Sequence, residues 1–147
     1  MSSKNIGTID PAEVFVLFGP KRITGFAKGQ YFNATKDNPD HTYEEGADGE
    51  GAFVRIPSNA WTITLTLMAT SRSNDYLWLC RETDLNLTPG GVLVPFAINH
   101  KGTKLVGAKA RIMGPPSVSY SSDGAETRVW VFKATFFEGT LTGLTSE

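Results

Sequence analysis

Residues Trp61 to Asp84, WTITLTLMATSRSNDYLWLCRETD, join the clearest strand pattern in the chain to its clearest helix pattern. Apolar residues and threonines alternate through the first part: Trp61, Ile63, Leu65 and Leu67 fall on one face of a strand, and Thr62, Thr64 and Thr66 on the other. Threonine suits the pleated surface of a sheet. The pattern predicts a half-buried strand whose outer face carries hydroxyl groups and meets either solvent or a neighbouring chain.

The second part of this stretch predicts a short helix from about Asn74 to Asp84. Ser71 or Ser73 can cap it, and Asp75 then falls in the first turn, where the helix dipole favours negative charge. The segment then has mostly apolar residues at 76, 77, 79 and 80 and polar residues at 75, 81, 82 and 84. This distribution suits a helix with one face packed on a core.

Length and composition indicate one domain, residues 1–147, that is large enough to bury a core without support from disulfides or metal ions. The formal net charge is −1, so the chain has no overall basic field for binding duplex nucleic acid. A single cysteine, Cys80, excludes an intramolecular disulfide. The start lacks the apolar core of a signal peptide and no apolar run reaches about 18 residues, so we expect synthesis in the cytoplasm and no membrane span.

Short apolar runs punctuated by glycine and proline predict a mainly β protein, a small β-barrel or sandwich with one helix. Besides the central strand, the expected strands are 14–18, 22–26, 30–35, 53–56, 92–98, 104–113 and 128–137, with a further one beginning near Val118 and Tyr120. The segments 22–26 and 30–35 are expected to form a meander or hairpin. A flexible N-terminal arm of about residues 1–11 and a short C-terminal tail of about residues 138–147 complete the domain.

An acidic stretch of about residues 36–51, KDNPDHTYEEGADGEG, interrupts the strands. It is either a long loop or a loosely paired hairpin, and loops of this length in a compact domain are usually functional or disordered. Its spacing does not match a calcium-binding loop, so we expect no metal there.

Three predicted strands carry features of a protein that assembles. Residues 14–18 and 128–137 are apolar on both alternating faces, which indicates strands covered on two sides. Pro95 in the strand 92–98 argues for a sheet edge or a bulge. Self-assembly covers both kinds of surface.

Catalytic and cofactor patterns are mostly absent, and we expect neither an enzyme nor a bound cofactor. His41 and His100 fall in a predicted loop and turn without a nucleophile elbow, and Cys80 falls on the apolar side of the predicted helix. No zinc ligand set or phosphate-binding loop is present in the sequence. A platform for single-stranded nucleic acid is a weaker alternative, on Tyr31, Phe32 and Phe53 with Lys28 and Lys36.

The stretch ITLTLMATSRSNDYLWLC resembles a structural family of bacteriophages, the tail tube proteins of contractile-tailed phages. The resemblance rests on the threonine-rich strand, on the helix entrance Thr70-Ser71-Arg72-Ser73-Asn74-Asp75, and on the strands at 92–98, 103–112 and 128–136 that follow in order. The segment VFVLFGPKRITGFAKG fits the first hairpin of that family, whereas the acidic stretch has no counterpart in the pattern.

This resemblance implies a β-barrel or sandwich subunit with a flanking helix, similar also to the tube protein of type VI secretion. Six such subunits form a ring, and stacked rings line a channel for genome delivery in the virion tail. It further implies sheath, baseplate and tape-measure proteins as partners, DNA that passes without specific binding, and no lipid anchor. A polar or acidic channel wall would let DNA pass, because attraction to phosphate would slow its transit.

The expected contact residues between subunits or rings lie in the acidic stretch, the proline-bearing strand and the tail: Thr42, Tyr43, Glu44, Glu45, Asp48, Glu50, Val94, Pro95, Leu141 and Leu144. Thr62, Thr64 and Thr66 are candidates for the channel wall. Two other readings stay open: another ring-forming tail component, such as a baseplate or terminator ring, and a monomeric β-sandwich that binds a ligand such as carbohydrate through Tyr43, Trp61 or Trp78.

Overall fold

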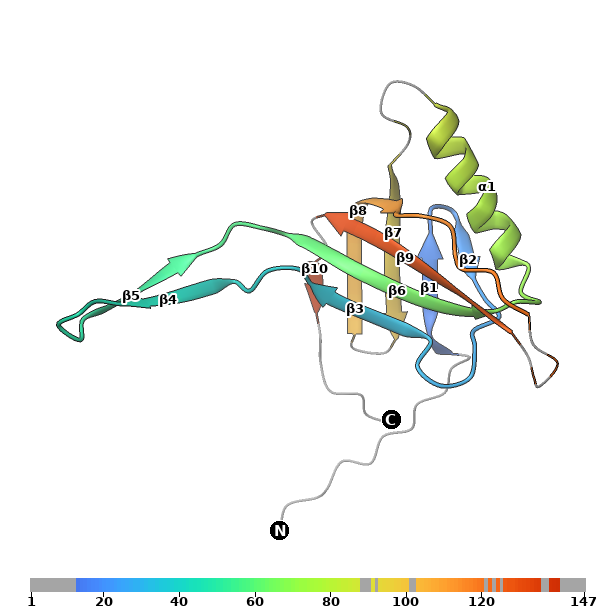
Figure 1. Ribbon diagram of the computed structural model, residues 1–147. Helices are drawn as coiled ribbons and strands as arrows, with labels where there is room; N and C mark the ends of the chain where they lie inside the picture. The colour runs from blue at the N-terminus through green and yellow to red at the C-terminus, as the bar shows by residue number, and fades with distance from the viewer. Residues whose placement is uncertain are drawn as a thin grey trace, which may run out of the picture.

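The computed structural model describes residues 13–87, 91, 93–100, 103–120, 122, 124, 126–135 and 138–140. The described part of the chain folds into a mainly antiparallel β structure with one helix beside it (Figure 1). The elements in chain order are β1 (Phe15–Phe18), β2 (Lys21–Ile23), β3 (Phe32–Lys36), β4 (His41–Glu45), β5 (Gly51–Arg55), β6 (Ala60–Met68), α1 (Ser73–Asn86), β7 (Val94–His100), β8 (Thr103–Ile112), β9 (Thr127–Thr135) and β10 (Glu138–Thr140).

The main sheet bends over itself into two layers, with the strand order β2-β1-β7-β8-β9-β6-β3 and β10 paired to β8. Strand β8 belongs to both layers, because its residues 104–106 pair with β10 while its residues 109–112 pair with β9. Strands β3, β6 and β9 therefore cross β1, β7 and the first half of β8 (Figure 1). The two ends of the sheet, β2 and β3, do not pair with each other, so the predicted sandwich is present and the barrel is not closed.

A bulge marks the place where β8 changes layer. Val94 pairs with Ala110 and Phe96 with Gly107, so β8 has one residue more than β7 across this step. Ala108 and Lys109 are both exposed there, which breaks the alternation of the strand. Pro95 lies opposite and has no N–H to donate, so the predicted bulge is confirmed. The alternative prediction of an edge is wrong, because β7 pairs with both β1 and β8.

Aromatic rings from the two layers meet in the core. The ring of Phe132 on β9 lies 5.2 Å from the ring of Phe18 on β1 and 5.1 Å from that of Phe96 on β7. All three side chains are almost fully buried. Such tilted pairs add to the burial of their area, so these contacts hold one layer to the other.

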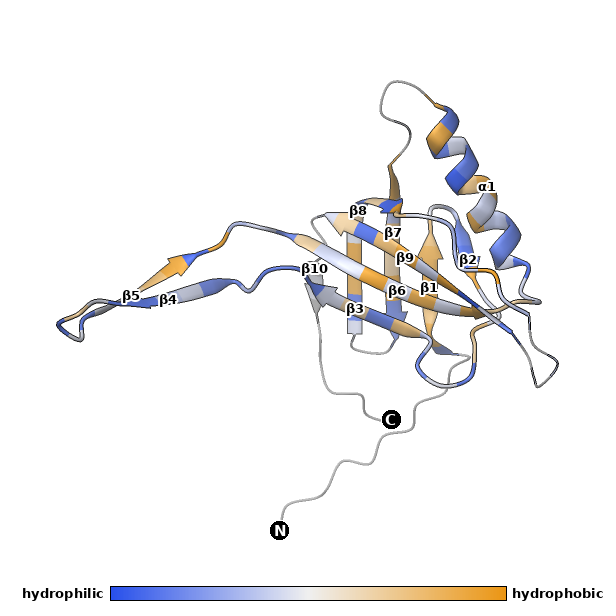
Figure 2. Cartoon of the chain, in the orientation of Figure 1, coloured by the Kyte–Doolittle hydropathy of each residue, from blue (hydrophilic) through white to orange (hydrophobic). Residues whose placement is uncertain are grey.

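The alternation from Trp61 to Leu67 is confirmed in β6. Ile63, Leu65 and Leu67 are fully buried, Trp61 packs partly buried against the same core, and the three threonines fall on the outer face. Strand β6 pairs along its whole length with β9 and with all of β3. Hydropathy colouring shows the apolar residues concentrated on the strands of the two layers (Figure 2).

The predicted helix is present and is longer than expected at both ends, from Ser73 to Asn86. Asp75 lies in the first turn as predicted. The predicted capping is wrong: Arg72 is the N-cap residue, and its side chain makes no cap hydrogen bond. The two serines instead hold a distant segment, because Ser71 Oγ donates to the carbonyl of Thr24 (2.6 Å) and Ser73 Oγ accepts from the amide of Thr24 (2.9 Å).

Asn74 joins the helix to the ends of two strands. Its side-chain oxygen accepts a hydrogen bond from Nε1 of Trp130 on β9 (2.9 Å), and its side-chain nitrogen donates to the carbonyl of Met68 at the end of β6 (2.9 Å). At the other side, the hydroxyl of Tyr76 donates to the carbonyl of Phe18 on β1 (2.7 Å). Helix α1 is therefore attached to both layers.

Several other sequence predictions change in the structure. The segments around β2 and β3 do not pair with each other; β2 pairs with β1, and β3 with β6. Val118 and Tyr120 lie outside any strand and are exposed. A short strand, β10, occupies the start of the predicted tail, because its backbone continues the layer beyond β8. The predicted N-terminal arm lies outside the described residues. No described helix is long and apolar enough to cross a membrane.

The contacts of Asn74 predict a stability effect. Replacing Asn74 with Ala leaves Nε1 of the buried Trp130 without its acceptor, which should lower the free energy of unfolding by about 2 kcal/mol. Urea denaturation measures this change. Asn38→Ala, which removes an exposed hydrogen bond to Ser58, is the matched control and should change stability by less than about 0.5 kcal/mol. Equal effects of the two substitutions would contradict the role of Asn74.

Candidate assembly surfaces

The acidic stretch forms a paired hairpin that projects from the two layers, which we call the arm (residues 37–59, Figure 1). Within the described part of the chain, strands β4 and β5 pair with each other only, and every one of their residues is exposed. They continue the β3–β6 pair outward, by about 30 Å at about 3.3 Å for each extended residue. Of the two readings that the sequence left open, the structure shows the paired hairpin.

One face of the arm carries an exposed aromatic pair. Tyr43 and Phe53 lie directly opposite each other, their rings are 5.0 Å apart, and their side chains are 53% and 76% exposed. Thr42 and Val54 form the neighbouring pair on the opposite face, and Val54 is also exposed. Figure 2 shows a hydrophobic segment in β5, outside the core. Apolar residues in this position suit contact with another protein surface.

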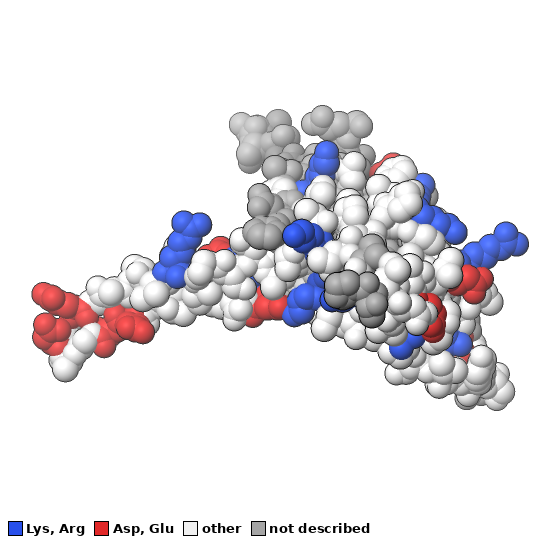
Figure 3. Space-filling model, turned by 90° about the horizontal axis from the view of Figure 1, so that it is seen from above, with Lys and Arg blue, Asp and Glu red and all other residues white. Residues whose placement is uncertain are grey.

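The tip of the arm gathers the predicted acidic residues. Glu44, Glu45, Asp48 and Glu50 line one shallow hollow at the turn. Backbone hydrogen bonds shape this turn: the amide of Gly46 donates to the carbonyl of Glu50 (2.7 Å), and the amide of Glu50 donates to Oδ1 of Asp48 (3.2 Å). Seen from above, the acidic side chains form a patch at the far end of the arm (Figure 3).

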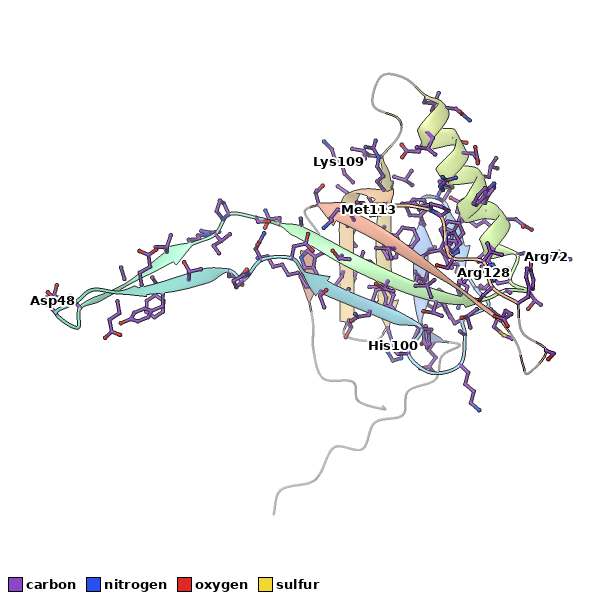
Figure 4. The ribbon with its side chains drawn as sticks, in the orientation of Figure 1. Asp48, Arg72, His100, Lys109, Met113 and Arg128 are labelled. Carbon is purple, nitrogen blue, oxygen red and sulfur yellow. The ribbon has the colours of Figure 1, made fainter. Side chains whose placement is uncertain are left out.

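The opposite end of the molecule carries arginines. Arg72 precedes α1 and Arg128 pairs with Leu67 near the end of β6, far from the arm along that strand. Figure 4 shows Asp48 at one end of the molecule and Arg72 and Arg128 at the other. The guanidinium of Arg128 lies 5.6 Å from the ring centre of Tyr120. The tip of the arm is therefore acidic, whereas the other end of the long axis carries two arginines among residues of both charges, including Asp75 and Glu126.

The other predicted contact residues are placed differently. Val94 and Pro95 lie in β7, inside the sheet, so the edge-strand reason for choosing them is wrong. Val94 packs partly buried against the core, while Pro95 is exposed and its carbonyl accepts from the amide of Gly19 (2.8 Å). Leu141 and Leu144 lie outside the described residues.

The threonines proposed for a channel wall lie together on the outer face of β6. Thr62 is flanked by Thr35 of β3 and Lys133 of β9, and Thr64 by Asn33 and Val131. Thr66 lies beside Val129. All three threonines are partly exposed. This face, which we call the threonine face, is of mixed character: it carries the three hydroxyl groups and Lys133, and also the side chains of Val129 and Val131.

A charged cluster anchors one end of the threonine face. The carboxylate of Asp37 accepts hydrogen bonds from Nζ of Lys133 and from Oγ1 of Thr62 (2.6 Å), and Nζ of Lys133 also donates to Oγ1 of Thr62 (3.2 Å). The bonds from Lys133 and then Thr62 hold the pKa of Asp37 below its usual value. The base of the arm is thus tied to β6 and β9 by side chains.

The sequence predicted that residues 14–18 are apolar on both faces of their strand, and the outer face of β1 is indeed apolar and exposed. Phe15 and Leu17 are about two-fifths exposed, beside Asn99 and Ala97 of β7, and Val106 of β8 continues the stripe next to Ala97. The guanidinium of Arg22 lies 4.0 Å from the ring centre of Phe15. The second face of β1 is therefore not covered within the described part of the subunit. The apolar pattern of residues 14–18 is readable from the sequence, whereas the exposure of Phe15 and Leu17 depends on tertiary structure.

Residues with catalytic potential are dispersed. His41 is exposed at the start of β4, whereas His100 is buried at the end of β7. Cys80 packs partly buried against the core, and burial together with Cys80 raises the pKa of Tyr76 to about 12. Among the described residues, no three histidine, cysteine or acidic side chains come close enough to hold a metal ion.

The aromatic residues named for ligand binding also lie on separate elements: Tyr43 on the arm, Trp61 on β6 and Trp78 exposed on α1. Tyr31 and Phe32, named for a nucleic-acid platform, pack partly buried against the core, whereas Phe53 is far out on the arm. The arrangement does not bring either set together as one binding surface.

Comparison with solved structures relates this fold to contractile injection systems. The chain is similar to a chain in the structure of the anti-feeding prophage cap (AFP tube terminating cap), with a TM-score of 0.59 and 15% identity over 96% of this chain and 97% of that chain. It is similar to a chain in the PVC sheath/tube terminator of an extracellular contractile injection system, with a TM-score of 0.58 and 14% identity over 89% and 95% of the two chains.

A chain in the PVC sheath-tube complex gives a TM-score of 0.57 and 15% identity over 91% of this chain and 93% of that chain. No known family model and no curated protein matches the sequence. At these identities the likeness establishes a shared fold, and it extends over nearly the whole length of each chain.

The charged cluster predicts a shift that can be measured. Lys133→Met removes the main cause of the low pKa of Asp37, so that pKa should rise toward the usual value of about 3.9. A lowered pKa stabilises the fold above the ordinary carboxyl pKa and is lost as pH falls through the folded value, so the variant should lose stability at neutral pH but not in strong acid. Carboxyl carbon NMR follows the titration.

Asp40 is the internal control for this experiment, because Lys36 rather than Lys133 lowers its pKa. Its titration should stay unchanged in Lys133→Met. An unchanged pKa of Asp37 in the variant would show that the cluster does not hold in solution.

Proposed function

We propose that this chain is a non-enzymatic structural subunit of a contractile tail or contractile injection system, and that it forms a ring at the end of the tube as a terminator or cap. The observation that carries this proposal is the shared fold with a chain from the AFP tube terminating cap over 96% of this chain and 97% of that chain. The similarity to the PVC sheath/tube terminator supports the same position.

A tube subunit is the second candidate function. It is favoured by the similarity to a chain in the PVC sheath-tube complex and by the resemblance of the sequence to tail tube proteins. In that case rings of six subunits stack into a channel for genome delivery. The difference between the two candidates is whether one ring accepts another on both of its faces or only on one.

The surfaces of the subunit suit a ring in either case. Among the described strands, β3 ends the sheet with one side unpaired, so the edge strand of a neighbour can extend the sheet by backbone hydrogen bonding. Exposed apolar residues on the arm and on β1 are available to be covered: Tyr43, Phe53, Val54, Phe15 and Leu17. Closure into a ring removes the exposed edges.

The threonine face supports a place along the channel. It is neither strongly acidic nor strongly basic, and its one cluster of charges, Asp37 with Lys133, is internally paired. A wall without net charge allows a polyanion to pass without the counterion-driven attraction that a basic wall would exert. The opposite, apolar face on β1 then points away from the channel, where sheath, baseplate or other tail proteins bind.

Electron microscopy of the purified protein tests the proposal. A terminator should give closed rings that do not lengthen as protein concentration rises, and native mass spectrometry should give the mass of six subunits. Stacked tubes that lengthen with concentration would replace the terminator by the tube subunit. A strictly monomeric species at high concentration would contradict both candidates.

The charges at the two ends of the subunit predict how neighbours bind. We infer that the acidic tip of one arm meets the Arg72 and Arg128 end of the next copy, because the two ends are complementary and far apart on one subunit (Figure 4). Reversal of the tip by changing all four of its acidic residues to Lys (Glu44, Glu45, Asp48 and Glu50) should weaken assembly at least tenfold, as should Arg72→Glu with Arg128→Glu. Analytical ultracentrifugation measures the shift in concentration.

The decisive sample mixes the two charge-reversed variants, each of which then presents an end complementary to the other. Assembly should return in the mixture, and failure to return would exclude this pairing. Glu82→Lys on α1 and Lys109→Glu on β8 are controls of the same chemical kind placed away from the two ends. They should leave assembly unchanged.

A further inference from the structure

An apolar groove of about 340 Å³ opens where β3 passes the ends of β7 and β8. Its walls are largely aromatic, with Tyr31 and Phe32 at the start of β3 and Trp61 on β6. Ile98 of β7 and Leu105 of β8 add aliphatic walls. An apolar cavity of about 150 Å³ accommodates one benzene ring, so this groove has room for two groups of that size.

A buried polar atom borders the groove. His100 lines it and is 5% exposed, and its Nε2 has no hydrogen-bond partner among the described residues. Oε2 of Glu13 is 3.8 Å away, which is too far for a hydrogen bond. Buried polar side chains in native proteins nearly always have a partner. A hydroxyl group suits this position, because it can donate to or accept from an imidazole nitrogen in either tautomer.

The exposed aromatic pair of the arm has the matching chemistry. Tyr43 and Phe53 present two rings 5.0 Å apart, and the first of them carries a hydroxyl. The ring of Phe53 is 76% exposed, so burying it against another surface removes a large apolar area from water. Contacts between aromatic rings add to the burial of their area, which favours aromatic occupants in a groove with aromatic walls.

Charges beside the aromatic pair and beside the groove are complementary. On the same face of the arm, Arg55 lies one pair nearer the base and Glu45 one pair nearer the tip. At the groove, Glu13 and Lys28 are exposed, and each precedes a residue that lines it. Arg55 therefore has an opposite charge available in Glu13, and Glu45 has one in Lys28.

The arm of the same subunit is held away from the groove. Lys36 of β3 pairs with Trp61, which is a wall of the groove. Tyr43 lies further along the chain, in a hairpin that continues outward from this pair. At about 3.3 Å for each extended residue, the backbone of Tyr43 is about 20 Å beyond Lys36. The arm that fits the groove is therefore the arm of another copy.

We propose that the groove receives the aromatic pair of the arm of a second copy of this chain. The rings of Tyr43 and Phe53 fill it, and the hydroxyl of Tyr43 pairs with Nε2 of His100. This inference rests on the proposed function, because assembly brings the second arm to the groove, and it names the surface that the arm binds. Strand β6 runs from the groove toward the arginine end, so the acidic tip reaches the arginines of the copy that holds the groove.

Disulfide trapping between two variants tests the contact while it keeps both rings and the groove intact. In a Cys80→Ala background, one variant carries Arg55→Cys and the other Glu13→Cys, and the two are mixed and mildly oxidised. The bond between them, identified by peptide mass spectrometry, should form at least tenfold faster than in the crossed control of Glu45→Cys with Glu13→Cys.

The outcomes separate this inference from the proposed function. Equal rates in the matched and crossed pairs would overturn the docking. So would the absence of a bond in a sample that electron microscopy shows to be assembled in rings, and the proposed function would then stand. A strictly monomeric protein would overturn both.

Assembly of variants without new cysteines gives an independent measurement by analytical ultracentrifugation. Phe53→Ala should raise the concentration needed for assembly at least tenfold, and Tyr43→Phe, which loses only the hydroxyl, at least threefold. Leu79→Ala removes an equally exposed apolar side chain from α1, and Thr42→Val removes a hydroxyl from the opposite face of the arm. Both controls should stay within about twofold of the wild type. Equal effects of variants and controls would overturn the docking.

Thiol labelling tests whether the groove is open before assembly. In the Cys80→Ala background, Gln30→Cys places a thiol on the exposed rim of the groove. It should react with a maleimide in the monomer about as fast as Val118→Cys, which is exposed elsewhere, and at least tenfold more slowly in assembled rings. Slow labelling already in the monomer would show that the subunit covers its own groove, and would overturn the docking.

Discussion

The junction at Asn74 is the interaction on which the rest of the structure depends. One amide side chain accepts from Trp130 on β9 and donates to the end of β6, while Ser71 and Ser73 hold the backbone of Thr24 from the other layer. Each partner is in a different part of the sequence, so the junction forms only when both layers are in place. It explains why polar residues occupy a position that is next to the core, where an unpaired amide would be costly.

Local sequence patterns predicted the elements well where one physical effect dominated. Strand β6 could be predicted because its alternation is long and unbroken, and the bulge at Pro95 because proline cannot donate a hydrogen bond. The helix boundaries and caps were less accessible, since Ser71 and Ser73 satisfy distant backbone groups instead of the helix end. Nothing local distinguishes a serine that caps from a serine that binds another segment.

Pairing between distant strands was the part that the sequence could not provide. Strands β2 and β3 are neighbours in the chain and looked like a hairpin, yet they are opposite ends of the sheet, because burying Phe18, Phe96 and Phe132 together requires the sheet to bend at β8. The candidate site likewise combines local features, which are visible in the sequence, with features that depend on the fold. The acidic stretch was named as a contact surface from its composition, and that role stays a prediction, whereas its projection and the arginines at the other end depend on tertiary structure.

The continuity of the arm with β6 has a mechanical consequence. The chain passes from β5 through β6 to the Asn74 junction, and β6 is held along its whole length by the ladder that it shares with β9. A force that pulls along the arm therefore loads all these backbone hydrogen bonds in shear at the same time, rather than opening them one after another. Strands loaded in this direction resist extension strongly. A pulling force on the tip of the arm is therefore transmitted to the helix before the β6–β9 ladder unpairs.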